Sequence, residues 1–228
     1  MSHHTASAAI LAGGRATRFG GQDKSALLID GRAILDHQIA ALAPLTTDLM
    51  IVGDATRPAR LSSGEVGPTT APDQAAIAQR VHGALPGGRE LRLVRDVVPG
   101  CGPLGGLHAA LTAARGTALL LVACDMPYLS SVFCAHLLSL ASDADVVVPQ
   151  SERGYHPLCA VYTSACLPSV AARLANRRLT LRGLLNDLRT RVVPVEEIRR
   201  FGDPDRLLAN VNTPADFADL EALQGHKP

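Results

Sequence analysis

The chain has 228 residues, enough to bury a substantial core as one α/β domain or two small ones. Its net charge of +1 and its scarce aromatic residues (3%) argue against a general nucleic-acid binder or a membrane-surface protein. The five cysteines form no C-x-x-C pair, which suits a reducing compartment and predicts neither zinc site nor disulfide. No apolar run approaches the roughly 18 residues of a membrane span, and residues 1–7 are too short and polar for a signal peptide. We therefore expect a cytoplasmic protein.

The predicted elements alternate between strands and helices along the chain. Runs that are apolar on both faces are typical of strands in a parallel sheet, and they occur at 8–12, 49–52, 91–94, 118–123 and 145–148. Helical periodicity fills the gaps at 34–42, 74–85, 104–114 and 132–140. Beyond Pro149 we expect strands at 158–162 and 191–195 and helices at 165–175, 181–188 and 214–223. This order predicts an α/β fold, a doubly wound and mostly parallel sheet with helices on both faces.

The first predicted strand leads directly into a glycine-rich loop, residues 11–24. Gly13 and Gly14 follow the strand, and Arg18 and Lys24 supply positive charge. Glycines let backbone N–H groups approach a phosphate, and the cations neutralise its charge. Lys24 is notable because nearly all other cations here are arginines, and a compact ammonium can reach between phosphates. The loop predicts phosphate binding, although it matches neither G-x-G-x-x-G nor G-x-x-x-x-G-K-[ST]. A glycine-rich turn with exposed arginines is the alternative.

Two aspartates stand where predicted strands end. Ligands of open α/β sheets bind beyond the carboxyl ends of the strands, and Asp96 and Asp125 follow the strands at 91–94 and 118–123. A carboxylate directly after a fully apolar strand is costly to bury without a partner. A Mg²⁺ ion shared with water and substrate phosphates would be a suitable one. The alternative is that Asp125 caps the helix that begins near Ser130.

A glycine–proline turn over 97–106 opens the helix predicted at 104–114. The N-terminus of this helix would face the same cleft and favour an anion. Gly105 and Gly106 are unfavourable within a first helical turn. Close approach of a ligand or a neighbouring strand would explain them, and loose turn geometry is the alternative.

Taken together, several segments resemble the molybdenum cofactor guanylyltransferases, within the wider family of nucleotidyltransferases that have a Rossmann-like domain. The segments follow the family's order over most of the chain: Leu11-Ala-Gly-Gly14 with Arg18-Phe-Gly-Gly21 and Asp23-Lys24, Asp96, Gly102-Pro-Leu-Gly105, Cys124-Asp-Met-Pro127, His156-Pro-Leu-Cys-Ala-Val-Tyr162, and Asn210-Val-Asn-Thr-Pro214 ahead of Asp216. One departure is Gly53, which falls where relatives can offer an asparagine to the nucleotide.

The resemblance implies transfer of GMP from GTP to molybdopterin that carries molybdenum, with release of pyrophosphate and a requirement for Mg²⁺. It implies one nucleotidyltransferase domain over residues 1–228, with GTP in the N-terminal half and molybdopterin in the C-terminal half. It also implies contact with proteins that deliver molybdopterin or receive the product. The residues that it assigns to GTP are Leu11, Ala12, Gly13, Gly14, Lys24, Asp96 and Asp125, of which Asp125 is the magnesium ligand.

For the molybdopterin side, the resemblance points to Asn210 and Asn212, and the residue chemistry adds Arg182. Arginine suits a phosphate through paired N–H donors, and asparagine suits the amide-like edge of a pterin. Asn210-Val-Asn212 is expected to place both asparagines on one strand face. We expect Lys24, Arg18 and Asp125 to be the catalytic residues, since nucleotidyl transfer depends on positioning and charge neutralisation.

Other functions remain open at this point. A related nucleotidyltransferase could use CTP or a sugar phosphate, although Gly13-Gly14 and the Asn-Thr-Pro segment resemble the guanine-selective members. A non-catalytic nucleotide-binding module is disfavoured by the joint presence of Lys24, Asp96 and Asp125. A dinucleotide-dependent oxidoreductase is least favoured, because no G-x-G-x-x-G follows the first strand.

Overall fold

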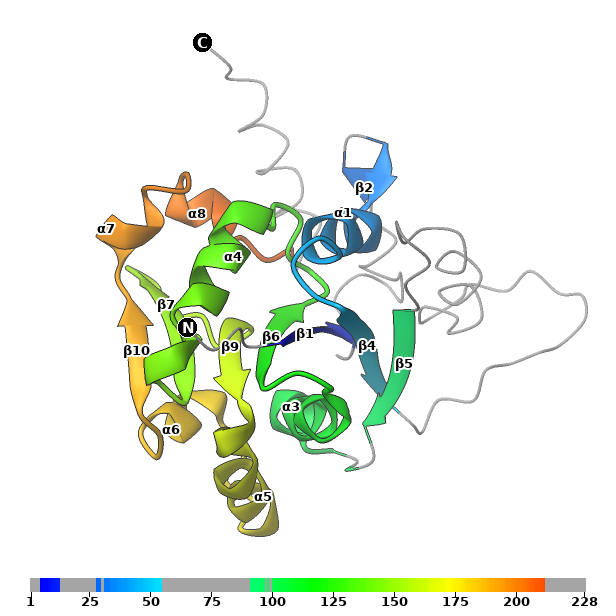
Figure 1. Ribbon diagram of the computed structural model, residues 1–228, viewed down its shortest axis with the longest axis vertical. Helices are drawn as coiled ribbons and strands as arrows, with labels where there is room; N and C mark the ends of the chain where they lie inside the picture. Colours follow the sequence, from blue (N-terminus) through cyan, green and yellow to red (C-terminus); the bar gives the residue numbers. More distant parts are fainter. Residues whose placement is uncertain are drawn as a thin grey trace, which may run out of the picture.

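A mixed sheet with helices on both faces dominates the computed structural model, which describes residues 5–12, 28–29, 31–54, 91–96, 98 and 100–211 (Figure 1). The strands are β1 (Ala6–Ala12), β2 (Leu28–Ile29), β3 (Arg32–Ala33), β4 (Asp48–Asp54), β5 (Leu91–Asp96), β6 (Ala118–Ala123), β7 (Val146–Ser151), β8 (Gly154–Tyr155), β9 (Cys159–Thr163) and β10 (Thr190–Val193). The helices are α1 (Ile34–Leu42), α3 (Gly102–Ala113), α4 (Ser131–Ser139), α5 (Leu167–Ala175), α6 (Leu181–Leu185), α7 (Val195–Ile198) and α8 (Pro204–Leu207), with short 3₁₀ turns at Ala141–Asp143 and Ser164–Cys166.

The main sheet has eight strands in the order β10-β7-β9-β6-β1-β4-β5, with β8 paired to β7. Strands β6, β1, β4 and β5 are parallel, and β10 is parallel to β7. Strand β9 is antiparallel to both of its neighbours, β6 and β7. The prediction of a mostly parallel, doubly wound sheet is confirmed, and β9 is its antiparallel member.

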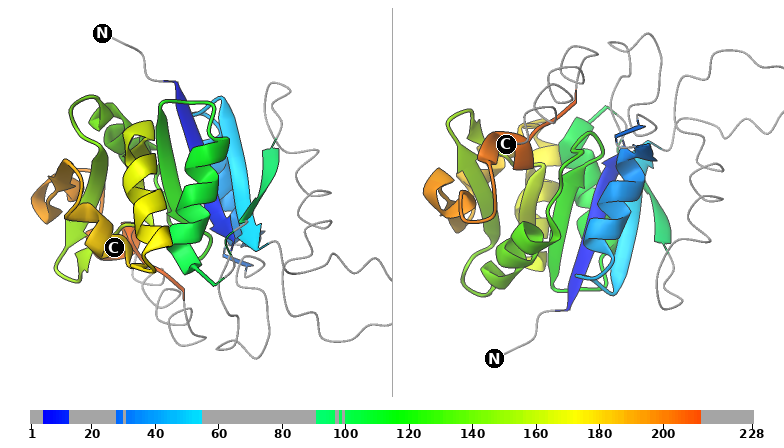
Figure 2. Two further views of the ribbon diagram at one scale, coloured as in Figure 1. Left: turned by 90° about the horizontal axis from the view of Figure 1, so that it is seen from below. Right: turned by 90° about the horizontal axis from the view of Figure 1, so that it is seen from above.

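Two hydrophobic cores cover the two faces of this sheet. Helices α3 and α5 pack on one face, and α1 and α4 pack on the other (Figure 2). In β6, Leu120 and Val122 belong to the core that includes α1 and α4, whereas Leu119 and Leu121 belong to the core that includes α3 and α5. Successive side chains of a strand point to opposite faces, so a strand between two cores must be apolar throughout. This explains why the central strands were recognisable from sequence.

Several predicted boundaries differ from the observed ones. The helix expected at 104–114 begins at Gly102, with Pro103 in its first turn, where the missing N–H of proline costs nothing. The strand expected at 145–148 extends to Ser151 and turns back into β8. The strand expected at 191–195 ends at Val193, before Pro194.

Among the remaining elements, the helix expected at 181–188 ends at Leu185, and the one expected from residue 165 begins at Leu167 after a 3₁₀ turn. The short helices α7 and α8 were not predicted. The helices expected at 74–85 and 214–223 lie outside the described residues. None of the described helices has the length and apolar character needed to cross a membrane.

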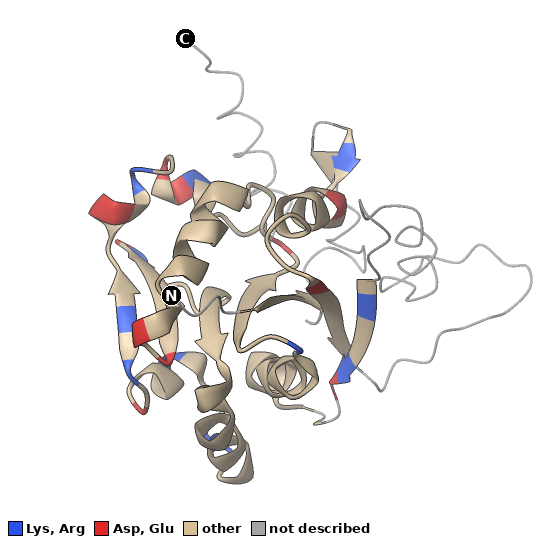
Figure 3. Cartoon of the chain, viewed as in Figure 1, with Lys and Arg blue, Asp and Glu red and all other residues tan. Residues whose placement is uncertain are grey.

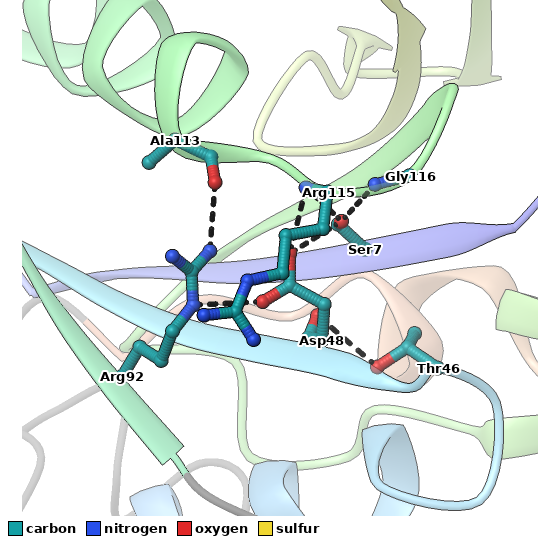
Figure 4. Close-up of polar contacts among 7 residues, drawn as sticks. All are labelled: Ser7, Thr46, Asp48, Arg92, Ala113, Arg115 and Gly116. Atoms are coloured by element: carbon teal, nitrogen blue, oxygen red, sulfur yellow. Dashed lines mark hydrogen bonds and ion pairs between the residues drawn. The ribbon is translucent and has the colours of Figure 1, made fainter.

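A buried aspartate joins three strands at the amino-terminal edge of the sheet (Figure 4). Asp48 of β4, 4% exposed, accepts hydrogen bonds from Ser7 Oγ in β1 (2.6 Å) and Arg92 Nε in β5 (2.8 Å). The backbone amide of Arg115, after α3, also donates to its carboxylate (3.0 Å). Arg92 in turn donates through Nη2 to the carbonyl of Ala113 at the end of α3 (2.7 Å). The network therefore fastens β1, β4, β5 and the end of α3 to one carboxylate.

We expect Asp48→Asn to lower the free energy of unfolding by about 3 kcal/mol, because it leaves part of a buried ion-pair network without a partner. Asp205→Asn is the matched control, since its ion pair with Arg153 is exposed (67% and 73%) and should contribute less than about 1 kcal/mol. Urea unfolding at pH 7 measures both. Equal losses in the two variants would contradict the structural importance of Asp48.

The same network predicts a pH dependence. Burial raises the pKa of Asp48, but the hydrogen bonds from Ser7, Arg115 and Arg92 outweigh it, so the net pKa lies below its ordinary value. A lowered pKa in the folded state contributes stability above the unfolded value of about 3.9, and this contribution is lost as the pH falls through the folded pKa. The difference in unfolding free energy between wild type and Asp48→Asn should therefore shrink below about pH 4.

Candidate active site

The carboxyl ends of the parallel strands bring the two predicted aspartates to one edge of the sheet. Leu11 of β1 pairs with Ala123 of β6, and Asp125 stands two residues beyond Ala123. Asp96 pairs with Asp54 of β4, which likewise lies two residues beyond the level of Leu11. Asp96 is the last residue of β5, and Asp125 lies in the turn after β6, so both lie at the carboxyl edge of the sheet, on strands separated by β1 and β4.

Between the aspartates, β1 ends in the two residues that were assigned to the nucleotide. The carbonyl of Leu11 accepts a hydrogen bond from the amide of Cys124 (3.2 Å), so this backbone adjoins the residue before Asp125. The Leu11 side chain is buried, and Ala12 is partly exposed at the edge. Leu11 can thus contribute only backbone groups to a ligand. The other predicted loop residues, Gly13, Gly14, Arg18 and Lys24, lie outside the described residues.

Asp96 lies against the first turn of α3. The amide of Val98 donates to Asp96 Oδ1 (3.0 Å), which orients the carboxylate. A Cβ added at Gly105 would stand 2.9 Å from Asp96 Oδ2, and one at Gly106 would stand 3.0 Å from Leu11 Cδ2. Close approach of neighbouring strands therefore explains the glycine pair, in place of loose turn geometry. An anion was expected at the start of α3, and the carboxylate of Asp96 lies beside the first turn of this helix, near Gly105.

Asp125 is partly exposed, in a loop whose backbone is held from two sides. Its carbonyl accepts a hydrogen bond from the amide of Val211 (2.9 Å). From α1, Gln38 Nε2 donates to the carbonyls of Ala123 (2.7 Å) and Met126 (3.0 Å), on either side of Asp125. The alternative role as a helix cap is wrong, because the hydroxyl of Ser130 accepts from the first turn of α4.

Gln38 is a positioning residue that the sequence interpretation missed. It is fully buried, and it lies on the apolar face of α1 between Ile34, Leu35, Ile39 and Leu42. A polar side chain on a buried helix face must bond to something inside the protein. That signal was present in the sequence, but it did not identify which backbone Gln38 holds.

On the other side of Asp125, β9 enters the sheet from the same edge. The carbonyl of Leu158 accepts from the amide of Ala123 (2.9 Å), so the chain segments that contain His156 and Asp125 leave the sheet side by side. His156 Nε2 lies 2.7 Å from the hydroxyl of Ser151 at the end of β7. The predicted acceptor side of the site therefore adjoins Asp125.

Arg182 reaches this part of the site from α6. A Cβ added at Gly154 would stand 3.1 Å from Arg182 Nη2, so the guanidinium lies directly over the β7–β8 turn. The buried Arg173 of α5 holds α6 in place by donating to Asp187 Oδ2 (2.6 Å) and to the carbonyl of Gly183. Figure 3 shows the charged residues around the rim of the sheet, whereas β1 and β6 carry none.

Asn210 is exposed, and Val211 beside it is buried and bonded to the Asp125 loop. The expected strand is not formed at Asn210 and Val211, and among the described residues Val211 is joined to the Asp125 loop by one backbone bond rather than by a ladder. Asn210 still lies next to the site, and Asn212 is outside the described residues.

A cavity of about 480 Å³ adjoins the loop after Asp125, and the sequence did not predict it. It lies between the start of α1, the residues after Met126, and α8. Arg206 stacks over the ring of Tyr128 at its wall, with 4.5 Å between the guanidinium carbon and the ring centre. In the described part of the chain, no group of three or more His, Cys, Asp or Glu is arranged to hold a metal ion.

Known proteins resemble this chain in sequence and in fold. The family model for MobA-like NTP transferase domains matches residues 8–192. The molybdenum cofactor guanylyltransferase of Desulfosudis oleivorans is 30% identical over 215 residues, which cover 93% of each chain. The crystal structure of molybdopterin-guanine dinucleotide biosynthesis protein A from Archaeoglobus fulgidus aligns with a TM-score of 0.72 at 21% identity, covering 97% of this chain and 100% of that one.

A cytidylyl enzyme has the same fold. The structure of 4-diphosphocytidyl-2C-methyl-D-erythritol synthase from Anaerococcus prevotii aligns with a TM-score of 0.67 at 13% identity, over 97% of this chain and 96% of that one. The fold therefore does not distinguish guanylyl from cytidylyl transfer. The family itself is decided by the sequence model and by the full-length relative, which confirm the resemblance. The chain belongs to the family of MobA-like NTP transferase domains.

Proposed function

We propose that this chain transfers GMP from GTP to molybdopterin that carries molybdenum, and releases pyrophosphate. The observation that carries the proposal is the position of Asp125. Its loop adjoins the end of β1, which leads into the glycine-rich loop, and on its other side it adjoins the His156 and Arg182 segment. The similarity to the molybdenum cofactor guanylyltransferase of Desulfosudis oleivorans supports the guanylyl reaction.

In this reaction an oxygen of the acceptor's phosphate forms a bond to the α-phosphorus of GTP. The bond between the α-phosphorus and the bridging oxygen breaks, and pyrophosphate leaves with the electron pair. The acceptor phosphate is already ionised, so the protein needs no strong general base. What it must supply is alignment of the two phosphates and neutralisation of their charge.

We assign the nucleotide to the side of β1 and β5, with the backbone of Leu11 and Ala12, the amides of Gly13 and Gly14, and the carboxylate of Asp96. Lys24 and Arg18 would neutralise the triphosphate. Arg182, Asn210 and Asn212 would receive molybdopterin on the side of β7 and β9. This division keeps residues 1–228 as one functional unit with a nucleotide half and an acceptor half.

Asp125 suits a role as the magnesium ligand. It is a partly exposed carboxylate at the end of an apolar strand, and its backbone is held by Gln38 and Val211. Mg²⁺ commonly takes one or two protein carboxylates and completes its shell with water and substrate phosphates, so a cluster of protein ligands is not required. When bound, the ion would offset negative charge on the reacting phosphates. The chain's own contribution is to hold the Asp125 carboxylate at that point.

We also place the protein in the cytoplasm. All five cysteines are free and four of them are buried, in keeping with a reducing compartment.

The first test is nucleotide selectivity. In the presence of Mg²⁺, we expect calorimetry to show GTP binding at least about tenfold more tightly than CTP, ATP or UTP, because a wrong base leaves polar groups of the site unpaired. CTP binding as tight as GTP would overturn the guanylyl assignment and favour the cytidylyl alternative.

The second test concerns Asp125. Asp125→Asn keeps the size of the side chain and removes the charge that a hard cation needs, so turnover should fall by about 100-fold while GTP affinity changes little. Asp143→Asn, an exposed substitution in a 3₁₀ turn away from the site, is the control and should leave turnover unchanged. An unchanged Mg²⁺ titration in Asp125→Asn would exclude the metal role.

The third test uses the contact between Gly105 and Asp96. Gly105→Ala forces the carboxylate to move, because its Cβ would stand 2.9 Å from Oδ2. If Asp96 binds the nucleotide, GTP affinity should fall by about tenfold, the value of one hydrogen bond to a charged group. The double variant with Asp96→Asn should be no weaker than Asp96→Asn alone, since both changes remove the same contact. Additive losses would show that Gly105→Ala acts elsewhere.

A further inference from the structure

His156 belongs to a motif that the nucleotide site does not use. Strands β6 and β9 run antiparallel, and their last backbone bond joins Ala123 to Leu158 (2.9 Å). Beyond it one chain continues to Asp125 and the other comes from His156. The histidine is thus on the opposite side of Asp125 from β1, where the nucleotide is assigned. His156 therefore lies on the side of the site that is assigned to the second substrate.

The imidazole is held rigidly by its own segment. The amide of His156 donates to the carbonyl of Pro149 (2.9 Å), and its carbonyl accepts from Cys159 (3.0 Å). The hydroxyl of Tyr162 donates to the carbonyl of Pro157 (2.8 Å), which fixes the next residue as well. On the ring, Nε2 lies 2.7 Å from Ser151 Oγ. Such a side chain has little freedom to turn away from the site.

The contacts of Ser151 allow a tautomer in which its hydroxyl donates to the histidine ring. Its hydroxyl oxygen accepts from the amide of Arg153 (3.2 Å), and its proton can be donated to Nε2 of His156, 2.7 Å away. In a neutral imidazole the ring proton is then on Nδ1. Nδ1 has no hydrogen-bond partner among the described residues. In this tautomer the ring presents one N–H donor to a ligand, and the NMR experiment below tests whether it is the form present.

The surroundings of this donor are positively charged. Burial lowers the pKa of His156, and the nearby Arg153 and Arg182 lower it further, against an opposing effect of Asp205. Asp205 is the ion-pair partner of Arg153 (3.5 Å), whereas Arg182 has no ion-pair partner in the described part of the chain. A neutral N–H donor beside an uncompensated guanidinium suits an anion with several oxygens, such as a phosphate monoester.

We propose that His156, oriented by Ser151, and Arg182 together bind the phosphate of the acceptor and hold it for attack. The inference rests on the proposed function, because it names the anion that this side of the site receives. In-line transfer requires the attacking and leaving oxygens on opposite sides of the phosphorus. A phosphate held across Asp125 from β1 would approach the nucleotide from the acceptor side, as this requirement needs. In this proposal His156 binds the acceptor directly, Ser151 is the positioning residue, and His156 takes no proton from the acceptor.

The kinetic test compares variants in the full-length protein with Mg²⁺, GTP and molybdopterin. His156→Phe keeps a ring and removes the donor, so the KM for molybdopterin should rise about tenfold, as for one lost hydrogen bond to a charged group. The Kd for GTP and the kcat at saturating acceptor should change less than threefold.

Two further variants test the same site. His156→Asn, whose amide can replace the Nδ1–H donor, should recover part of the loss, and Arg182→Ala should resemble His156→Phe. Arg189→Ala is the control, because this exposed arginine pairs with Asp145 before β7, at the opposite edge of the sheet, and its loss should leave the KM for molybdopterin unchanged.

An NMR experiment distinguishes failure of the anion site from failure of the proposed guanylyl function. With ¹⁵N-labelled histidine, the His156 ring should show the Nδ1–H form at neutral pH, and its signals should shift on addition of inorganic phosphate in wild type but not in Arg182→Ala. An Nε2–H ring, no response to phosphate, or a rise in the Kd for GTP in His156→Phe would each overturn the anion site. If wild type makes no guanylyl product while the phosphate response persists, the proposed function fails and the anion site stands.

Discussion

The carboxylate of Asp48 sets the arrangement on which the site depends. A buried carboxylate is costly unless it is fully hydrogen-bonded, and its partners here come from β1, β5 and the chain after α3. A slip of one residue in any of these strands would move every side chain to the other face of the sheet and break the network. The register set at this edge carries through the parallel strands. This shared register places Leu11, Asp96 and the start of the Asp125 turn along the opposite edge.

At that opposite edge, the protein uses uncharged groups to hold charged ones. Gln38 secures the backbone around Asp125, and the space at Gly105 admits the carboxylate of Asp96. Gly154 likewise leaves room for Arg182. None of these three supporting residues needs to touch a substrate. They allow the ionised groups to stay partly exposed and directed to one edge, which suits a reaction in which charge neutralisation and alignment matter most.

The shared fold of guanylyl and cytidylyl enzymes places base selectivity outside the sheet itself. In the proposed function, guanylyl and cytidylyl enzymes would share the carboxyl edge of the sheet with Asp125. This edge would bind the phosphates of any nucleoside triphosphate. The base would be read by backbone groups of the glycine-rich loop after β1. The acceptor would be read by the segment from β7 to α6, where His156 and Arg182 lie. Fold, base choice and acceptor choice thus reside in different parts of one chain.

The sequence by itself determined the central strands, the glycine-rich loop and the positions of Asp96 and Asp125 after their strands. Uniform apolarity reports burial on both faces, and a carboxylate after such a run is unusual on local grounds alone. Only the tertiary structure decided that β9 runs antiparallel beside β6, that Ser130 rather than Asp125 caps α4, and that Ser151 meets His156. Local sequence patterns indicate which residues are buried, but they do not indicate which distant segment of the chain lies beside them. That is decided when pairing, register and packing of the whole sheet are satisfied together.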